Sequence, residues 1–427
     1  MFSIISPKQF LYKILDLVKK NKNNHYKEVK NLVEKGTNNT SQLKALLQHA
    51  CTSTIFYNKF DYKKGIKAFP VINKNTIKTN YSSFQSEKFK KAKCRIVATS
   101  GSTGIPFKVH QNLIKILRNT ADNLYFSELA GYNIGNKLYY FRMWNAFDKK
   151  GVLERWIMNM IPIDVFELTD VFFSNFLKKI KNNKSPKSWI GYASSFETMC
   201  KYLEKNEKKP INCNLKSVIA ISESLSPYTK QTLKKYFNVD VVSRYSNVEN
   251  GIIAQQLPST SYFILNTASY YVEILDINSD KPVELGQKGR IVITDLFNFS
   301  VPMIRYDTGD IGVMEIIDKK PVLTSIEGRK IDAITNTKGE IIANNIMLLL
   351  NNYHELNQCQ LIQKNNKVYV FKININGEFK NERKFIDDFK TYLGEDAIIK
   401  VEYVDEIPLL ASGKRRVMIN ETNTKTS

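Results

Sequence analysis

Apolar residues recur at helical spacing near the start of the chain and then form short runs separated by amphipathic stretches. Between residues 8 and 50, the spacing of Phe10, Ile14 and Val18 and then of Leu43 and Leu47 predicts two helices, separated at residues 36–40. The pattern then predicts strands at 96–98, 139–143, 189–192, 218–221 and 239–242, and helices at 112–129, 171–180, 196–203 and 228–237. Strands that alternate with helices indicate an α/β fold with a largely parallel sheet.

The pattern changes at about residue 262. Segments 270–275, 290–294 and 310–314 are β-rich and separated by turns, which predicts a small barrel or an antiparallel sheet. From residue 328 onward, a strand at 367–373, a helix at 381–393 and a strand at 397–404 predict a compact α+β module. We therefore expect a large domain, with a helical N-terminal part at 1–95 and a core at 96–327, followed by a C-terminal domain at 328–427.

The composition is that of a globular protein. Of the 427 residues, 43% are hydrophobic and 24% are charged, which are ordinary fractions for this class. No apolar run approaches the length of a membrane span, and the first residues lack the layout of a signal peptide. The five cysteines are scattered without a Cys-x-x-Cys motif, which argues against a zinc site or a disulfide framework. We therefore expect a cytoplasmic protein.

The formal net charge of +22 is the one unusual quantity, and it makes nucleic acid or an anionic membrane surface natural partners to consider. Much of the excess is lysine interleaved with asparagine and isoleucine, as in residues 178–184, which is typical of solvated surface. No zinc, helix-turn-helix or aromatic RNA-binding motif accompanies the charge. We therefore expect no nucleic-acid partner and at most weak peripheral contact with a membrane.

A hydroxyl- and glycine-rich segment follows the strand predicted at 96–98. Gly101 and Gly104 permit turn conformations in which successive N–H groups point at one anion, and Lys108 adds a positive charge. The segment differs from the P-loop pattern G-x-x-x-x-G-K-[ST]. It suits a polyphosphate, and the alternative is an ordinary surface loop. Its hydroxyl donors are Thr99, Ser100, Ser102 and Thr103.

Further segments occur in the order of the motifs shared by adenylate-forming enzymes. Residues 242–249, Val-Ser-Arg-Tyr-Ser-Asn-Val-Glu, resemble the Tyr-Gly-x-Thr-Glu segment of that superfamily, and residues 305–310, Arg-Tyr-Asp-Thr-Gly-Asp, match its Arg-Tyr-x-Thr-Gly-Asp segment. Residues 328–332 resemble the hinge into a mobile lid, and residues 408–414 match the lid's Pro-x4-Gly-Lys. The chain thus resembles the acyl-CoA ligase superfamily over most of its length. The resemblance implies a layered α/β large domain with a small β-barrel-like part, followed by a mobile α+β lid.

Less specific segments resemble the phenylacetate–CoA ligase branch. They are residues 69–74, 190–195, 221–226 and 301–310. Within that branch, the chain is nearest to relatives in capsular-polysaccharide biosynthesis. The resemblance implies an AMP-forming ligase that uses ATP and Mg²⁺ to convert a carboxylic acid into acyl-AMP. The acyl group then passes to a thiol, of coenzyme A or a carrier protein, or to an amine.

The resemblance also implies a role for each motif residue. The 99–108 segment holds the β- and γ-phosphates, Glu249 holds Mg²⁺, and Tyr245, followed by Ser246, stacks on adenine. Asp310 accepts hydrogen bonds from both ribose hydroxyls, and Arg329 contacts the nucleotide near the hinge. Lys414 reaches the carboxylate and the α-phosphate in the transition state. The backbone that lies against adenine and the acyl group is that of Ser222, Glu223 and Ser224.

Each of these residues also has a structural alternative. Tyr245 suits a core aromatic, Glu249 a helix cap, and Lys414 a solvated basic turn. Asp310 suits an ordinary turn aspartate after Gly309, and residues 222–224 suit a plain connection. Ser246 replaces a glycine of the family pattern, Val248 replaces a hydroxyl residue, and Ile331 occupies the hinge. Lys108 also lies one place later than in the common pattern, and one extra residue precedes Gly339. A second hypothesis is therefore a nucleotide-binding protein that keeps the fold with reduced catalysis.

Overall fold

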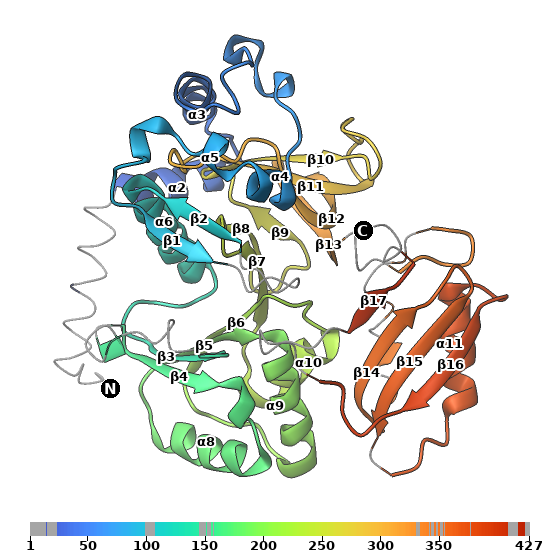
Figure 1. Ribbon diagram of the computed structural model, residues 1–427. Helices are drawn as coiled ribbons and strands as arrows, with labels where there is room; N and C mark the ends of the chain where they lie inside the picture. Colours follow the sequence, from blue (N-terminus) through green and yellow to red (C-terminus); the bar gives the residue numbers. More distant parts are fainter. Residues whose placement is uncertain are drawn as a thin grey trace. The chain divides into compact units, whose positions relative to one another are not determined.

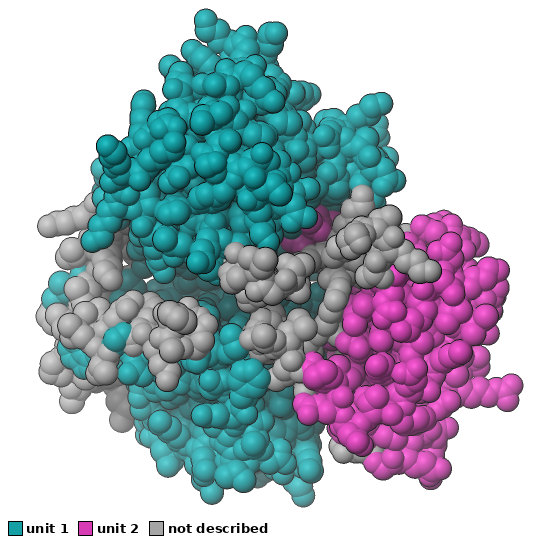
Figure 2. Space-filling view, in the orientation of Figure 1, with its two compact units in different colours: residues 1–225, 229–308, 312–325 teal, residues 226–228, 309–311, 326–427 magenta. Residues whose placement is uncertain are grey.

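The computed structural model describes residues 24–98, 107–144, 158–329, 355–375, 377–408 and 417–422, together with residues 14, 151, 155–156, 334–340, 342, 346, 349–350 and 353. The chain divides into two compact units, which Figure 2 colours separately. Unit 1 comprises residues 1–225, 229–308 and 312–325, and unit 2 comprises residues 226–228, 309–311 and 326–427. The large α/β part and the separate C-terminal part expected from the sequence are both present.

The described part of the large N-terminal region is built on one sheet of eleven strands, in the order β10-β11-β12-β13-β9-β8-β7-β6-β5-β3-β4 (Figure 1). One half is parallel and consists of β3 (Lys137–Arg142), β4 (Met160–Asp164), β5 (Lys187–Tyr192), β6 (Leu215–Ile221) and β7 (Val241–Asn247). The other half consists of β8 (Gly251–Gln256), β9 (Phe263–Leu265), β10 (Tyr270–Leu275), β11 (Lys288–Asp295), β12 (Tyr306–Ile317) and β13 (Lys320–Arg329).

The chain reverses direction between β7 and β8, and this reversal separates the two halves. The pairs β7–β8, β8–β9, β9–β13 and β10–β11 are all antiparallel. The strands after residue 262 are therefore arranged as an antiparallel sheet, which continues from the parallel half in the strand order.

The α-helices correspond closely to the expected ones where both can be compared. They are α2 (Asn24–Lys35), α3 (Thr40–Ser53), α4 (Lys74–Thr79), α5 (Tyr81–Phe84), α6 (Leu113–Leu129), α8 (Asp170–Asn182), α9 (Ala193–Asn206), α10 (Pro227–Phe237) and α11 (Glu382–Leu393). Short 3-10 turns lie at η1 (Tyr62–Lys64), η2 (Ile66–Ala68), η3 (Glu87–Phe89) and η4 (Val165–Glu167). The part of the first expected helix that precedes residue 24 lies, apart from residue 14, outside the described residues.

The helix α8 illustrates why these segments fold as they do. The Thr169 side chain accepts a hydrogen bond from the Phe172 N–H and caps the first turn. Phe173, Phe176 and Ile180 then lie on one face and are buried. That face packs on the parallel half of the sheet, and Figure 1 shows α8 and α9 along one side of β3, β4 and β5.

An aromatic cluster fills the core of this parallel half. Trp189 of β5 has no exposed surface and packs against the rings of Phe141, Phe176, Phe196 and Phe237. These rings come from two strands and three helices, so the cluster joins the sheet to the helices that cover it. Burial of such large apolar groups provides most of the stabilisation in a layer of this type.

The strand expected at 96–98 is present as β1 (Arg95–Ala98), and it belongs to a separate two-stranded sheet. It pairs antiparallel with β2 (Lys108–Gln111), so that Ala98 lies opposite Lys108 and Arg95 opposite Gln111. The hydroxyl-rich segment is thus bracketed by one short ladder, and its residues 99–106 lie outside the described residues.

Unit 2 contains a four-stranded sheet in the order β16-β15-β14-β17. The strands are β14 (Leu356–Gln363), β15 (Val368–Ile375), β16 (Ile398–Tyr403) and β17 (Met418–Asn420). Phe385 and Phe389 of α11 pack on Phe371 of β15 and provide much of the core. The sequence predicted β15, α11 and β16, and it missed the flanking strands β14 and β17.

Within the residues that the structure describes, no helix is both long enough and apolar enough to span a membrane.

Candidate active site

The carboxyl ends of three adjacent parallel strands bring several expected site residues to one edge of the sheet. Strands β5, β6 and β7 end at Tyr192, Ile221 and Asn247, and they are paired in register. Ligands of open α/β sheets bind at this edge. The segments 222–224 and 245–249, both expected to contact the nucleotide, lie at the carboxyl ends of the neighbouring strands β6 and β7.

The loop after β6 is sharply turned. Ser222 has φ +70°, a left-handed conformation that is uncommon for a residue with a side chain. The Glu223 carboxylate accepts a hydrogen bond of 2.9 Å from the Ser194 N–H, in the first turn of α9. This contact places a negative charge at a helix N-terminus, where it is favourable. The Glu223 side chain is thus engaged with α9, and the backbone of the loop is the part suited to a ligand.

Two of the sequence motifs, separated by about sixty residues, contact each other directly. The Tyr245 hydroxyl donates to Thr308 Oγ1 at 3.1 Å, and the Tyr306 hydroxyl donates to Glu249 Oε1 at 2.9 Å. Thr308 Oγ1 donates in turn to the Ile291 carbonyl at 2.9 Å. The end of β7 is therefore fixed to the start of β12 by side chains from both motifs.

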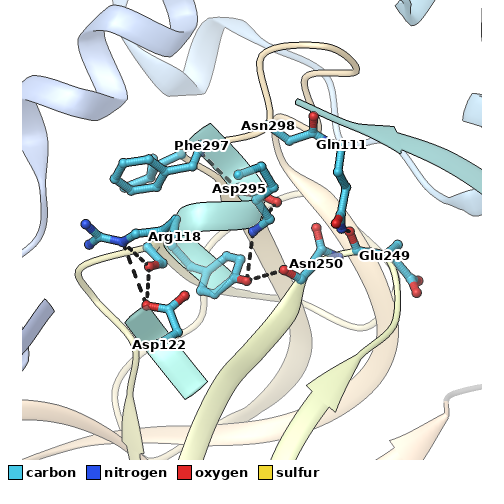
Figure 3. A network of polar contacts seen from close by, with 12 residues as sticks. Gln111, Arg118, Asp122, Glu249, Asn250, Asp295, Phe297 and Asn298 are labelled. Carbon is cyan, nitrogen blue, oxygen red and sulfur yellow. Dashed lines mark hydrogen bonds and ion pairs between the residues drawn. The ribbon is translucent and has the colours of Figure 1, made fainter. Parts of the chain in front are cut away.

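Glu249 lies in the turn between β7 and β8, and it is 7% exposed. The Gln111 side-chain amide donates to the Glu249 carbonyl at 3.0 Å. In Figure 3, the Glu249 carboxylate points away from the polar network behind it. Among the described residues, no hydrogen bond or ion pair reaches its Oε2 atom. The backbone of Glu249 is thus held in place by Gln111, and one oxygen of its carboxylate is available to a ligand.

The arginine of the Arg-Tyr-Asp-Thr-Gly-Asp motif has a structural task. Arg305 is itself left-handed, with φ +51°. Its guanidinium forms an ion pair with Glu273 at 3.1 Å and donates to the Phe69 carbonyl at 3.1 Å. These contacts of the guanidinium hold an otherwise strained backbone in place. The residues that follow it in the motif are thereby aimed toward β7.

The remaining described candidates lie on the strands next to these motifs. Asp310 is half-buried in β12 and directly follows Gly309, whose φ is +82°. Ser246 is half-buried at an irregularity in the β7–β8 pairing. Lys108 is exposed at the start of β2. Val248, which replaces a hydroxyl residue of the family pattern, is 54% exposed in the same turn as Glu249.

Several candidates fall where the structure gives no side-chain description. Arg329 is the last residue of β13, and its side chain is not described. The residues that lie outside the described residues altogether are Thr99, Ser100, Gly101, Ser102, Thr103, Gly104, Ile331 and Lys414. Their roles stay predictions.

Sequence reasoning missed three residues that contact the site. Tyr306 and Thr308 belong to a recognised motif, in which only Asp310 was assigned a role, so their motif membership was an available signal. Gln111 lies seven residues beyond Gly104 in an ordinary strand, and nothing in the sequence distinguishes it. Its contact with Glu249 depends on tertiary structure alone.

The charge at the strand ends also affects one tyrosine. Burial raises the pKa of the Tyr192 hydroxyl above its ordinary value of 10.0, and the nearby Arg142 guanidinium opposes that rise. Tyr192 therefore stays protonated at neutral pH and can donate a hydrogen bond. Trp144 and Tyr140 flank Arg142, with ring centres 5.2 and 5.7 Å from its Cζ atom. Arg142 at the end of β3 is thus flanked by two aromatic rings near this edge of the sheet.

The residues present fit a magnesium ion that is shared with phosphates. In the described part of the chain, no group of three or more His, Cys, Asp or Glu side chains forms a metal cage. Mg²⁺ is commonly held by one or two carboxylates together with substrate phosphates and water. A single buried carboxylate with an available oxygen, as at Glu249, matches that requirement.

The fold resembles that of solved acyl-CoA ligases at low sequence identity. 2-Hydroxyisobutyryl-CoA ligase, in the postadenylation state with R3-HIB-AMP, superposes with a TM-score of 0.69 and 17% identity, over 90% of this chain and 89% of that chain. ATP-bound MatB from Rhodopseudomonas palustris gives a TM-score of 0.57 and 14% identity, over 75% and 66% of the two chains. The anthranilate CoA ligase AuaEII, with anthranoyl-AMP, gives 0.53 and 16%, over 75% and 64%.

Sequence comparison adds one match. Residues 333–421 match the family model of the CapK C-terminal domain. No curated protein sequence matches the chain. By structure, the chain therefore has the fold of the adenylate-forming acyl-CoA ligases, and its last part resembles the CapK C-terminal domain.

Proposed function

We propose that this protein activates a carboxylic acid by ATP-dependent adenylation and transfers the acyl group to a thiol or an amine. The observation that carries the proposal is the contact between two motifs. Tyr245 and Glu249 at the end of β7 are hydrogen-bonded to Thr308 and Tyr306 of β12. Side chains expected to bind adenine and Mg²⁺ are thus fixed to the strand that carries Asp310.

Adenylation requires two anions, a carboxylate and the ATP α-phosphate, to approach in line. The roles proposed for this chain follow from that need. Glu249 holds the metal through Oε2, Tyr245 stacks on adenine, and Asp310 accepts from the ribose hydroxyls. The 99–104 segment with Lys108 binds the β- and γ-phosphates. A bound Mg²⁺ neutralises charge on the phosphate oxygens.

Lys414 and Arg329 belong to the C-terminal part, which we propose acts as a mobile lid. A lysine on a lid acts only when the lid closes, so its charge stabilises the transition state more than it stabilises bound ATP. The candidate acceptors are coenzyme A, a carrier-protein thiol and an amino sugar. The match of residues 333–421 to the CapK C-terminal domain supports a place in capsular or cell-surface polysaccharide biosynthesis.

The first experiment is ATP–pyrophosphate exchange across a panel of carboxylic acids. We expect exchange with at least one acid, and a loss of roughly 10²-fold in Glu249→Gln, because the neutral amide would hold Mg²⁺ at the phosphates much more weakly than the carboxylate does. Asp310→Ala should weaken nucleotide binding. Glu284→Gln changes an exposed glutamate in the same way and serves as the control. Exchange that is unchanged in both site variants would refute the assigned roles.

The second experiment separates the two half-reactions. Lys414→Ala should lower the adenylation rate by roughly 10²-fold or more, while ATP affinity and acyl transfer from supplied acyl-AMP change little. Arg416→Ala, in the same basic run, is the matched control. Equal losses in both half-reactions would identify a structural lysine, and no loss would identify a solvated turn.

One observation favours a second candidate, a nucleotide-binding protein with reduced catalysis. Val248 places an exposed apolar side chain in the Glu249 turn, where the family pattern has a hydroxyl. A hydroxyl there contributes a hydrogen bond toward phosphate or metal-bound water, and valine cannot. ATP binding without exchange for any acid would support this candidate. Val248→Thr would then be expected to restore measurable exchange.

A further inference from the structure

A buried ion pair lies behind the Glu249 turn, and none of the sequence motifs includes it. Lys115 of α6 and Asp295 at the end of β11 have fully buried side chains, and Lys115 Nζ lies 2.7 Å from Asp295 Oδ2. Such a pair costs several kcal/mol of desolvation for each ion, and apolar residues of similar volume often stabilise a fold as well or better. Stability alone therefore gives little reason for these two charges.

The same lysine also determines the direction in which the Tyr270 hydroxyl donates its hydrogen bond. Lys115 Nζ donates to the Tyr270 hydroxyl at 3.1 Å, and an ammonium group can only donate. The Tyr270 hydroxyl must therefore use its own proton elsewhere, and it donates to the Asn250 carbonyl at 2.5 Å. Burial raises the pKa of this hydroxyl well above its ordinary value of 10.0, so it keeps that proton.

These contacts reach the residue after Glu249. The Glu249 carbonyl accepts from Gln111 and the Asn250 carbonyl accepts from Tyr270, so two successive carbonyls are held by buried donors (Figure 3). Gly251 completes the turn with φ +113°, and a Cβ atom there would lie 3.2 Å from the Tyr270 hydroxyl. A side chain at position 251 would therefore crowd Asn119 and the Tyr270 hydroxyl, and glycine leaves room for the tyrosine beside the turn.

We propose that Lys115, Asp295 and Tyr270 are positioning residues that fix the Glu249–Asn250 turn so that the Glu249 carboxylate is preorganised for a nucleotide-bound metal ion. This inference rests on the proposed function. The Lys115–Asp295 pair orients the Tyr270 hydroxyl, and the hydroxyl sets the plane of the Asn250 peptide. Together with Gln111 on the preceding peptide, it determines where Glu249 Oε2 lies. All three side chains are fully buried behind the turn, so their proposed role is to position Glu249.

The test measures metal-dependent binding of ATP. Tyr270→Phe removes one hydroxyl and keeps the ring, so we expect a folded protein. The affinity for a non-hydrolysable ATP analogue is measured with Mg²⁺ and with EDTA, and the Mg²⁺ concentration at half-saturation is recorded. We expect the half-saturating Mg²⁺ concentration to rise roughly three- to tenfold, the effect of one lost hydrogen bond, while binding in EDTA is unchanged.

Two further variants complete the design. Gln111→Leu frees the neighbouring carbonyl and should produce a shift in the same direction. Tyr271→Phe changes the next residue of β10, on the opposite face of the strand, and should not shift the Mg²⁺ dependence. The melting temperature of each variant is measured in parallel.

The possible outcomes separate the two proposals. If wild-type protein shows Mg²⁺-dependent binding and Tyr270→Phe shows the same dependence, the positioning role is overturned and the proposed function stands. If Tyr270→Phe weakens binding equally with Mg²⁺ and with EDTA, the network supports only the fold and the inference is likewise overturned. If the wild-type protein does not bind the analogue under either condition, the proposed function is overturned and the inference with it.

Discussion

The two halves of the eleven-stranded sheet are stabilised by different interactions. The parallel half has an aromatic core in which Trp189 contacts four phenylalanine rings. The antiparallel half, where α6 packs, contains two buried charged pairs. Lys115 pairs with Asp295, and Arg118 lies 3.7 Å from Asp122, with no side-chain exposure in any of the four. An apolar core tolerates small shifts of its side chains, whereas a buried charge needs a partner at a defined position. The antiparallel half, which fixes Glu249, therefore allows fewer side-chain arrangements than the parallel half.

The charged half contains a group whose ionisation the fold disfavours. Burial raises the pKa of the Asp122 carboxyl, and the Arg118 and Lys115 charges oppose that rise. Arg118 also donates to Ser269 Oγ and to the Ala268 carbonyl, both at 2.7 Å, and stacks over the Phe297 ring at 4.1 Å. Arg118 is therefore held by several buried partners, and removing one member of a charged pair should cost more than removing both.

The largest stability effect should come from the aromatic half. Trp189→Ala leaves a large cavity among four phenylalanines, and we expect it to lower the free energy of unfolding by about 3–5 kcal/mol. Trp156→Ala, which removes a tryptophan that is 52% exposed, should cost about 1 kcal/mol or less. Denaturant unfolding of both variants gives the comparison. Similar losses at the two sites would show that the cluster is not the core of this half.

The next effect distinguishes a broken ion pair from a replaced one. Lys115→Met leaves Asp295 buried without its cation, and we expect a loss of about 3 kcal/mol or more. The double variant Lys115→Met/Asp295→Leu should recover most of that loss of stability. The part not recovered is the contribution of the 3.1 Å hydrogen bond that the Phe297 N–H donates to Asp295. Chemical denaturation measures both. A double variant as unstable as the single one would show that the pair itself stabilises the fold.

The smallest effect is a dependence on pH. Burial lowers the pKa of His49 below its ordinary value of 6.5, and its ring nitrogen lies 2.9 Å from the Phe299 carbonyl. The unfolded chain therefore takes up the proton first, so the stability contributed by neutral His49 is present above pH 6.5 and falls as the pH drops toward the folded-state pKa. His49→Gln keeps a donor for that carbonyl and should show a smaller fall in melting temperature between pH 7.5 and 5.5. An identical fall in the variant would exclude His49 as a cause.

These two halves also differ in how far the sequence predicts them. The strand and helix alternation of the parallel half follows from periodic apolar residues, and β3, β5, β6, α8, α9 and α10 occur where expected. The helix α6 was also expected, but the sequence pattern does not predict which of its faces is buried. Lys115, Arg118 and Asp122 face the interior while Leu113 and Leu117 are exposed, the reverse of the usual pattern. Only the tertiary partners of these charges explain that orientation.

The candidate site shows the same limit. Glu249, Tyr245 and Asp310 were identifiable because they belong to short motifs with fixed spacing. The groups that hold the Glu249 turn come from β2, β10 and β12. Tyr306 lies more than fifty positions from Glu249 in the sequence, and Gln111 lies more than a hundred positions from it. Such contacts leave no periodic or local signal. A single sequence therefore reveals the reacting groups more readily than the groups that position them.

The length of the short strand β2 fixes the distance between the two residues at its ends. Its first residue, Lys108, adjoins the hydroxyl-rich segment, and its last, Gln111, is bonded to the Glu249 backbone. Three residue steps of an extended strand span about 10 Å, which sets the separation between these two attachment points. Inserting one residue into β2 would turn Gln111 to the opposite face of the hairpin. We therefore expect the length of β2 to tolerate hardly any change, because an insertion would separate Gln111 from the Glu249 carbonyl.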